Sequence, residues 1–134
     1  MTEDPIELVS TALAHFADGD LDGMLALLSD DVVLVGAPEY PGAGEAHGRE
    51  EVRRTLVEDW GEVWAEMRFD AEELSTHGDR VLVLGRARTR GDLTGVQFDN
   101  PMAIVATVQA GAISRFEFFL DLEQARRAAG ADAA

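Results

Sequence analysis

The first third of the chain carries apolar residues at helical spacing, followed by a β-branched run. An Asp4-Pro5 start and apolar side chains at every fourth position predict a helix over residues 5–17. A second apolar stripe predicts a short helix over residues 21–29. The run DDVVLVG then predicts a buried strand that ends at Gly36, a residue with no side chain to contribute to a core.

The middle of the chain predicts an irregular loop and then a long helix. Residues 37–48, APEYPGAGEAHG, contain two prolines and three glycines, so we expect a loop over the mouth of the domain. From residue 49 to residue 67 the apolar side chains lie at helical spacing, which predicts one long helix. Its broad apolar face is formed by Val52, Leu56, Trp60, Val63, Trp64 and Met67.

The remainder predicts consecutive hairpins. The turn sequences HGDR, RGDLTG and QAGA separate expected strands over residues 69–77, 80–90, 96–109 and 112–120. EQARRAA predicts a final helical turn that ends at Gly130. This order of elements predicts an α+β fold with a curved antiparallel sheet. At 134 residues we expect a single domain over residues 1–134, with its core within about 5–130.

Strand alternation assigns side chains to the two faces of this sheet. The expected interior set is Val81, Val83, Gly85 and Ala87 on one strand and Phe116, Phe118 and Leu120 on the last. The expected outer set is Leu82, Leu84, Arg86, Arg88 and Arg90, together with Arg115, Glu117, Phe119 and Asp121. We expect Arg86 and Arg88 to pair with Glu117 or Asp121, either across strands as solvated surface pairs or across a dimer interface.

Charge and composition exclude several classes of function. The net charge is −15, from 26 acidic residues and 11 arginines with no lysine, and such a surface repels nucleic acid and anionic membranes. Without lysine there is no Schiff-base catalysis, and without cysteine there is no thiolate nucleophile. No apolar run is long enough to span a bilayer and the acidic N-terminus lacks signal-peptide features, so we expect a cytoplasmic protein. The only candidate metal cluster, EAH at 45–47, is too small, and we expect neither metal nor cofactor.

Several strings occur in a characteristic order over about residues 6–130: HFADGDLDGMLALLSDDVVLVG, HGREEVRRTL, GDRVLVLGRARTRG, NPMAIVATVQAGAISRFEFFLD and EQARRAAG. Together they resemble the SnoaL-like branch of the nuclear transport factor 2-like superfamily, which includes ketosteroid isomerases and polyketide cyclases. The resemblance implies a cystatin-like roll, in which a curved sheet wraps the long helix as a cone and leaves an apolar cavity open at one end. It also implies a homodimer that pairs through the outer face of the sheet.

The resemblance also identifies positions where relatives carry catalytic groups. The ketosteroid isomerase base falls on Gly36, its tyrosine on Ala12 and its protonated aspartate on Ile104. The acidic and histidine positions of the cyclases fall on Phe118 and Phe116. None of these five residues can transfer a proton, so the catalytic residues are unknown.

Six residues are candidates for ligand contact: Tyr40, His47, Trp60, Asn100, Phe116 and Phe118. Four of them also have structural alternatives. For His47 a capping or surface role is the alternative, and for Tyr40 it is packing within its loop. Asn100 precedes Pro101 as a strand-end residue would, and Trp60 lies at the spacing of a core residue.

Three functional hypotheses remain open from the sequence. The first is an isomerase-, cyclase- or hydratase-type enzyme that acts on a hydrophobic ligand through His47 or an unusual carboxylate such as Glu39 or Asp59. The second is a noncatalytic protein that binds a hydrophobic small molecule in a dry cavity. The third is a dimeric accessory protein whose cone is filled by Trp60, Phe116 and Phe118.

Overall fold

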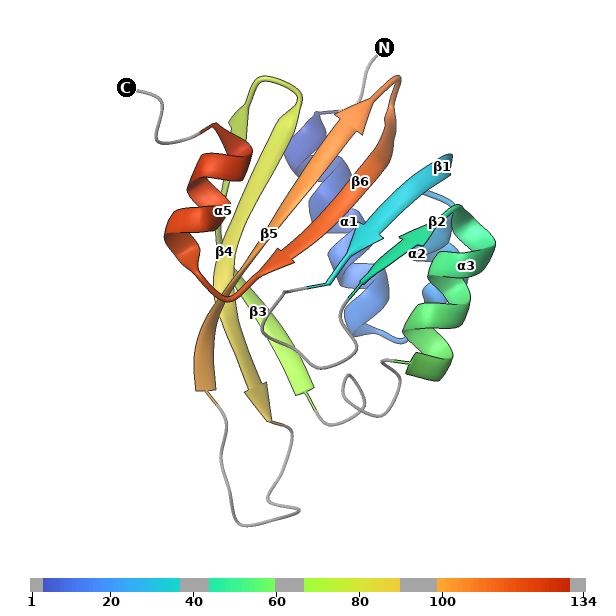
Figure 1. Cartoon of the computed structure of the whole chain (residues 1–134), viewed down its shortest axis with the longest axis horizontal. Coiled ribbons are helices and arrows are strands. Elements are labelled where there is room, and N and C mark those ends of the chain that lie inside the picture. The colour runs from blue at the N-terminus through green and yellow to red at the C-terminus, as the bar shows by residue number, and fades with distance from the viewer. Residues whose placement is uncertain (1–3, 37–43, 60–66, 90–98, 131–134) are drawn as a thin grey trace.

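Figure 1 shows the computed structural model, which describes residues 4–36, 44–59, 67–89 and 99–130. The helices are α1 (Pro5–Ala17), α2 (Leu21–Leu25), α3 (Arg49–Arg54) and α5 (Leu122–Ala129), and a π-helical segment (Thr55–Asp59) continues α3. The strands are β1 (Leu28–Val35), β2 (Glu45–His47), β3 (Met67–His77), β4 (Arg80–Thr89), β5 (Asp99–Gln109) and β6 (Ala112–Phe119). The α+β fold expected from the sequence is confirmed.

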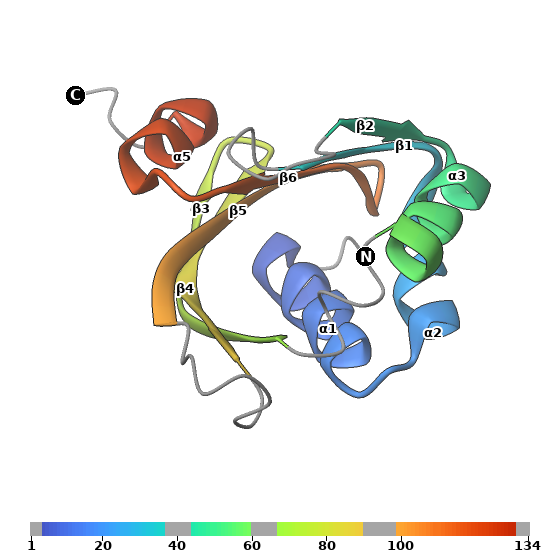
Figure 2. The same ribbon diagram turned by 60° about the horizontal axis from the view of Figure 1, so that its bottom comes forward.

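The six strands form one curved sheet in the order β2-β1-β6-β5-β4-β3. Neighbouring strands are antiparallel, as expected, except that β1 and β6 are parallel. This pair joins strands from opposite ends of the chain, so no hairpin turn dictates its direction. Figure 2 shows α1 lying in the hollow of the sheet and α5 on its outer side. The expected curved sheet wrapped around a helix is therefore confirmed, and the helix that it wraps is α1.

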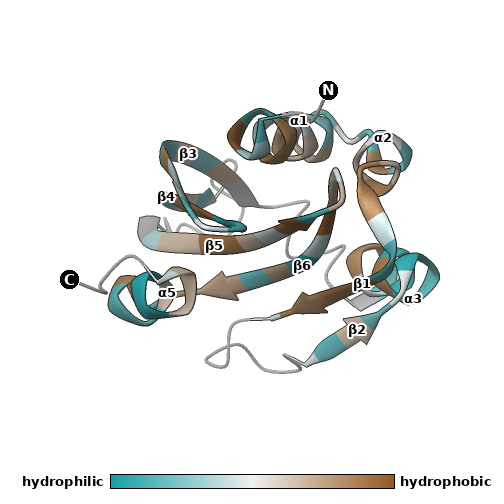
Figure 3. Cartoon of the chain, turned by 90° about the horizontal axis from the view of Figure 1, so that it is seen from above, coloured by the Kyte–Doolittle hydropathy of each residue, from teal (hydrophilic) through white to brown (hydrophobic). Residues whose placement is uncertain are grey.

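The main core lies between α1 and the concave face of the sheet. Val81, Val83 and Ala87 of β4 are fully buried there, as strand alternation predicts. They pack with apolar residues of the other elements, among them Leu8, Val9, Ala12, Val32, Leu34, Met102, Ile104, Ala106, Ile113, Phe116 and Phe118. In Figure 3 apolar residues run along β1 and β5, whereas much of α3 is hydrophilic.

A second, smaller core lies on the convex face of the sheet, under α5. Its strand residues are Leu82, Leu84, Ala103, Val105 and Phe119, which we call the convex patch. Ala125 and Ala129 of α5 are buried against it, and their small side chains let the helix approach the strands closely. Asp121 caps the N-terminus of α5 and Gly130, in the left-handed conformation, ends it. Leu82, Leu84 and Phe119 therefore lie on the outer face as predicted, but this chain covers them itself.

Three expected boundaries are wrong. Met67, predicted to end a helix, begins β3, and α3 gives way to the π-helical segment at Thr55. The sequence pattern does not reveal this change, because Val52 and Leu56 are buried in either helical form. Leu28 and Ser29, predicted as helical, belong to β1, because Leu28 pairs with Ile113 of β6.

The third boundary concerns the predicted loop over residues 37–48. Residues 45–47 form β2, because Ala46 pairs with Leu34 and is buried in the main core. Residues 37–43 lie outside the described part of the chain, as do Trp60, Val63 and Trp64 of the predicted helical face.

Gly85 allows an unusually close approach between β3 and β4. The register of this pair shifts between Ala71 and Glu73, which marks a bulge in β3 opposite Gly85. A Cβ atom on Gly85 would lie 2.1 Å from the backbone oxygen of Asp70 and 3.0 Å from Cζ of Phe69. Only glycine fits at this position, where the sheet bends around the core.

Candidate functional site

Three strands end and three strands begin at one end of the sheet. β1, β4 and β6 end there at Val35, Thr89 and Phe119, while β2, β3 and β5 begin there. This mouth end, at the bottom of Figure 1, is also where the described strands meet the gaps 37–43, 60–66 and 90–98. The candidate site is the concave interior of the roll, approached from this end.

Apolar side chains from three elements form the interior wall. Phe116 and Phe118 project from β6, with ring centroids 5.8 Å apart and ring planes inclined at 44°. Ile104 of β5 pairs directly with Phe118, and Ala12 faces the same core from α1. All four residues are at most 7% exposed and belong to the main core.

The structure therefore brings together four of the positions at which the resemblance places catalytic groups. Ala12, Ile104, Phe116 and Phe118 belong to one apolar cluster. The fifth position, Gly36, is also buried, directly after β1, and its N–H donates a hydrogen bond to the backbone oxygen of Gly44 (3.0 Å). No proton donor or acceptor stands at these five positions, apart from the backbone.

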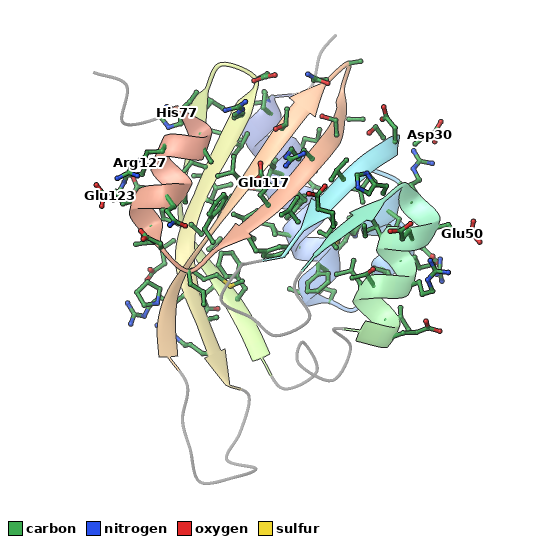
Figure 4. All side chains as sticks on the ribbon, in the orientation of Figure 1. Asp30, Glu50, His77, Glu117, Glu123 and Arg127 are labelled. Atoms are coloured by element: carbon green, nitrogen blue, oxygen red, sulfur yellow. The ribbon has the colours of Figure 1, made fainter. Side chains whose placement is uncertain are left out.

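Charged groups lie outside this interior. Among the described residues none with a polar or charged side chain is buried, and no cluster of histidine and carboxylate side chains suits a metal ion. Figure 4 shows Asp30, Glu50 and Glu123 pointing away from the ribbon. Within the described ranges, the interior offers only hydrophobic and aromatic contact to a ligand.

His47 lies away from the wall. Its side chain is 63% exposed and its Nε2 is 3.3 Å from a carboxylate oxygen of Glu45. Ala46, between these two residues, faces the core, so strand alternation places His47 on the convex side of β2.

The structure says less about the other three candidates. Asn100 lies in β5 opposite Ala87, and only its backbone is described. Tyr40 and Trp60 lie outside the described residues, as does Glu39. Phe116 and Phe118 are thus the two candidates that the structure brings together.

Two ion pairs described on the outer face join other residues than the expected ones. Glu117 ion-pairs with Arg115 of its own strand (2.8 Å), and Arg88 Nε lies 3.6 Å from a carboxylate oxygen of Asp70. Asp121 caps α5. Glu117 thus pairs within its own strand, and Arg88 pairs with the neighbouring strand β3. A pair between Arg88 and Glu117 would have joined β4 with β6, which are not neighbours in the sheet.

Arg49 is a positioning residue that the sequence analysis missed. Its Nε and Nη2 both donate to the backbone oxygen of Leu28, at 2.9 and 2.6 Å, and Nη1 lies 3.3 Å from Asp30. The β1–β6 register shifts between Leu28 and Val33, so Arg49 supports the strand where its pairing is interrupted. No local pattern marks this arginine, because its partner lies 21 residues away.

A family model for the SnoaL-like domain matches residues 9–116. The chain belongs to the SnoaL-like domain family. This assignment agrees with the curved, unclosed sheet and with the resemblance found in the sequence. No sequence among curated proteins matches this SnoaL-like chain significantly.

Solved structures share the fold over most of their length. An NTF2-like protein from Burkholderia thailandensis is 28% identical, with a TM-score of 0.78 over 92% of this chain and 98% of that one. TerC, co-crystallised with polyporic acid, is 25% identical, with a TM-score of 0.73 over 92% of this chain and 95% of that one. A Xanthomonas campestris protein with a cystatin-like fold is 16% identical, with a TM-score of 0.76 over 87% and 90%, and shows the fold alone.

Proposed function

We propose that this SnoaL-like protein binds a hydrophobic small molecule in its concave interior without catalysing a reaction from the described wall. The observation that carries the proposal is the apolar cluster at the catalytic positions of relatives: Ala12, Ile104, Phe116 and Phe118. A wall without donors or acceptors favours apolar ligands, because polar ones lose their hydration without compensation. The similarity to TerC, which was crystallised with a small molecule, supports the same class of function.

An isomerase-, cyclase- or hydratase-type enzyme is the second candidate. General acid–base catalysis needs a proton-transfer group within hydrogen-bond reach of the ligand. Asp59 ends the π-helical segment next to the gap 60–66, and π-helical turns are frequent at functional sites. The enzyme hypothesis therefore depends on Asp59 or on Glu39.

We also propose that two copies pair through the convex face of β1, β2 and β6, outside α5. The register places Val33 between His47 and Arg115, and Val35 between Glu45 and Glu117. A second copy turned by a two-fold axis sets the acidic row against the basic one, as a self-complementary interface requires. We expect this dimer in the cytoplasm. Separately, no helix in the described ranges is long and apolar enough to cross a membrane.

The binding proposal is tested by thermal unfolding of the full chain with steroids, polyketides, terpenoids and polyporic acid. A ligand at 100 times its dissociation constant adds about 2.7 kcal/mol to the free energy of unfolding. For a chain of this size we expect the melting temperature to rise by about 8 °C with at least one compound.

Chemical analysis of the stabilising mixture separates the two candidates. Recovery of the unchanged compound after long incubation supports binding alone, whereas conversion that is lost in Asp59→Asn supports the enzyme. If no compound in a broad panel raises the melting temperature, the binding proposal is wrong and the filled-cone accessory protein is favoured.

A further inference from the structure

We propose that Ser75 and His77 form a nucleophile–base pair that accepts an acyl group from activated esters, at a site separate from the concave interior. Ser75 Oγ and His77 Nε2 lie 2.9 Å apart, within hydrogen-bond distance. A hydroxyl in contact with an imidazole nitrogen is the arrangement that covalent catalysis by serine requires. This activity goes beyond the proposed binding function and does not depend on it.

Both side chains lie on the convex face of the sheet, near the end of the edge strand β3. Ser75 pairs across the strands with Leu82 of the convex patch, and His77 pairs with Arg80. Directly opposed residues of an antiparallel pair share a face, so the serine, the histidine and the arginine lie on one side. Because β3 begins at the mouth end, the pair lies at the opposite end of this strand from the candidate site.

The end of the β3–β4 hairpin that carries the pair is held in place by β5 and α5. The N–H of Val108 donates a hydrogen bond to the backbone oxygen of Asp79 in the turn (2.8 Å). Arg80 Nη1 donates to the backbone oxygen of Ala128, which joins the same end to α5. In Figure 4 His77 lies near the upper end of this helix. Fixed strand positions keep the hydroxyl and the imidazole in contact, so little order has to be gained during the reaction.

The pair can be reached from solvent. Ser75 and His77 are half-buried, whereas Arg80 is exposed. An ester therefore approaches Ser75 Oγ without entering the packed core. The guanidinium of Arg80 has further N–H groups beyond the one that binds Ala128, and these are available to stabilise negative charge on an ester carbonyl.

The reaction is an acyl transfer through a covalent intermediate. With the ring proton on Nδ1, Nε2 of neutral His77 accepts the hydrogen bond from Ser75 and then its proton. The bond between Oγ and the carbonyl carbon forms, the bond from that carbon to the leaving-group oxygen breaks, and the proton passes from Nε2 to the departing alcohol or phenol. Water then attacks acyl-Ser75 with His77 as the base, which releases the carboxylic acid and restores the serine.

Neutral esters with a good leaving group are the expected class of substrate. A single arginine stabilises an oxyanion less than a set of preorganised backbone donors does, so amides and esters with poor leaving groups react more slowly. The net charge of −15 disfavours anionic esters relative to neutral ones.

Incubation of the full chain with 4-nitrophenyl acetate tests the proposal. We expect release of 4-nitrophenolate together with transfer of an acetyl group to the protein, which peptide mass spectrometry after acid quenching should locate on Ser75. Ser114 is the internal control, because it is also half-buried but its Oγ donates to the backbone oxygen of Thr107 (3.3 Å) instead of to an imidazole. It should stay unmodified.

Substitutions of the two residues separate the nucleophile from the base. Ser75→Ala should abolish acetylation of this peptide. His77→Gln keeps a hydrogen-bond acceptor for Ser75 but no base, and should lower the rate of acetylation about a hundredfold. Ser114→Ala should leave the rate unchanged. Circular dichroism and melting curves confirm that the variants are folded.

The outcomes distinguish this activity from the proposed binding function. An acetyl group found on a histidine, or spread over several serines, overturns the proposal, as does an unmodified Ser75. An unchanged rate in folded His77→Gln also overturns it, because the histidine is then not the base. If no hydrophobic compound raises the melting temperature, the binding function is wrong while acetylation of Ser75 is unaffected.

Discussion

Gly85 shows at the scale of one residue why a small side chain is required in a strand. A methyl group there would meet the backbone oxygen of Asp70 at 2.1 Å, and a backbone atom cannot rotate away as a side chain can. We expect Gly85→Ala to lower the free energy of unfolding by roughly 3 kcal/mol, measured by urea denaturation.

Gly44→Ala is the matched control for this prediction. A Cβ atom on Gly44 meets no atom of the described residues within 4 Å, so we expect a change within about 0.5 kcal/mol. Equal stability of Gly85→Ala and the unmodified chain would show that β3 and β4 separate at little cost, contrary to the prediction.

At the scale of elements, α5 covers the convex patch of the sheet. Ala125 is fully buried between the helix and the convex patch, where a carboxylate has no partner and no water. We expect Ala125→Asp to lower the free energy of unfolding by about 2–4 kcal/mol and to release the amide hydrogens of α5 to faster exchange. Hydrogen exchange and urea denaturation measure the two effects.

Gln124→Asp controls for the added negative charge. Gln124 is exposed in the first turn of α5, where a carboxylate interacts favourably with the helix dipole. Its stability should stay within about 0.5 kcal/mol of the unmodified chain. Similar losses in both variants would indicate that charge, rather than burial under α5, is responsible.

At the scale of the whole molecule, the proposed dimer is tested by mass. Light scattering after size exclusion should give twice the 14.5 kDa of one chain. Val33→Asp places a charge at the centre of the proposed interface and should yield monomers. If the unmodified chain is a monomer at micromolar concentration, the dimer proposal is wrong.

Val57→Asp is the control for an exposed valine elsewhere. Val57 is 56% exposed and belongs to the π-helical segment rather than to β1, β2 or β6. We expect this variant to remain dimeric. Dissociation by Val57→Asp, with Val33→Asp still dimeric, would move the interface to the helical side of the molecule.

The candidate site could be predicted from the sequence only in part. Strand alternation placed Phe116 and Phe118 correctly in the interior, because successive side chains of a strand point to opposite faces. His47 could not be placed in the same way, because its three-residue strand forms only by pairing with β1. Nor does Arg49 show its partner, since Leu28 is far away in the chain.

Local sequence patterns were sufficient to predict α1, most strand boundaries and the two faces of β4 and β6. Burial of one face of a helix or strand gives its apolar residues a period of 3.6 or 2, which can be recognised in the sequence. Such a period shows which side of an element is apolar, but not which surface will cover it. Only tertiary packing determined that α1 fills the hollow, that α5 covers the convex patch and that β1 pairs in parallel with β6. Each of these contacts joins apolar surfaces distant in sequence, and their choice depends on shape and chain connectivity across the whole molecule.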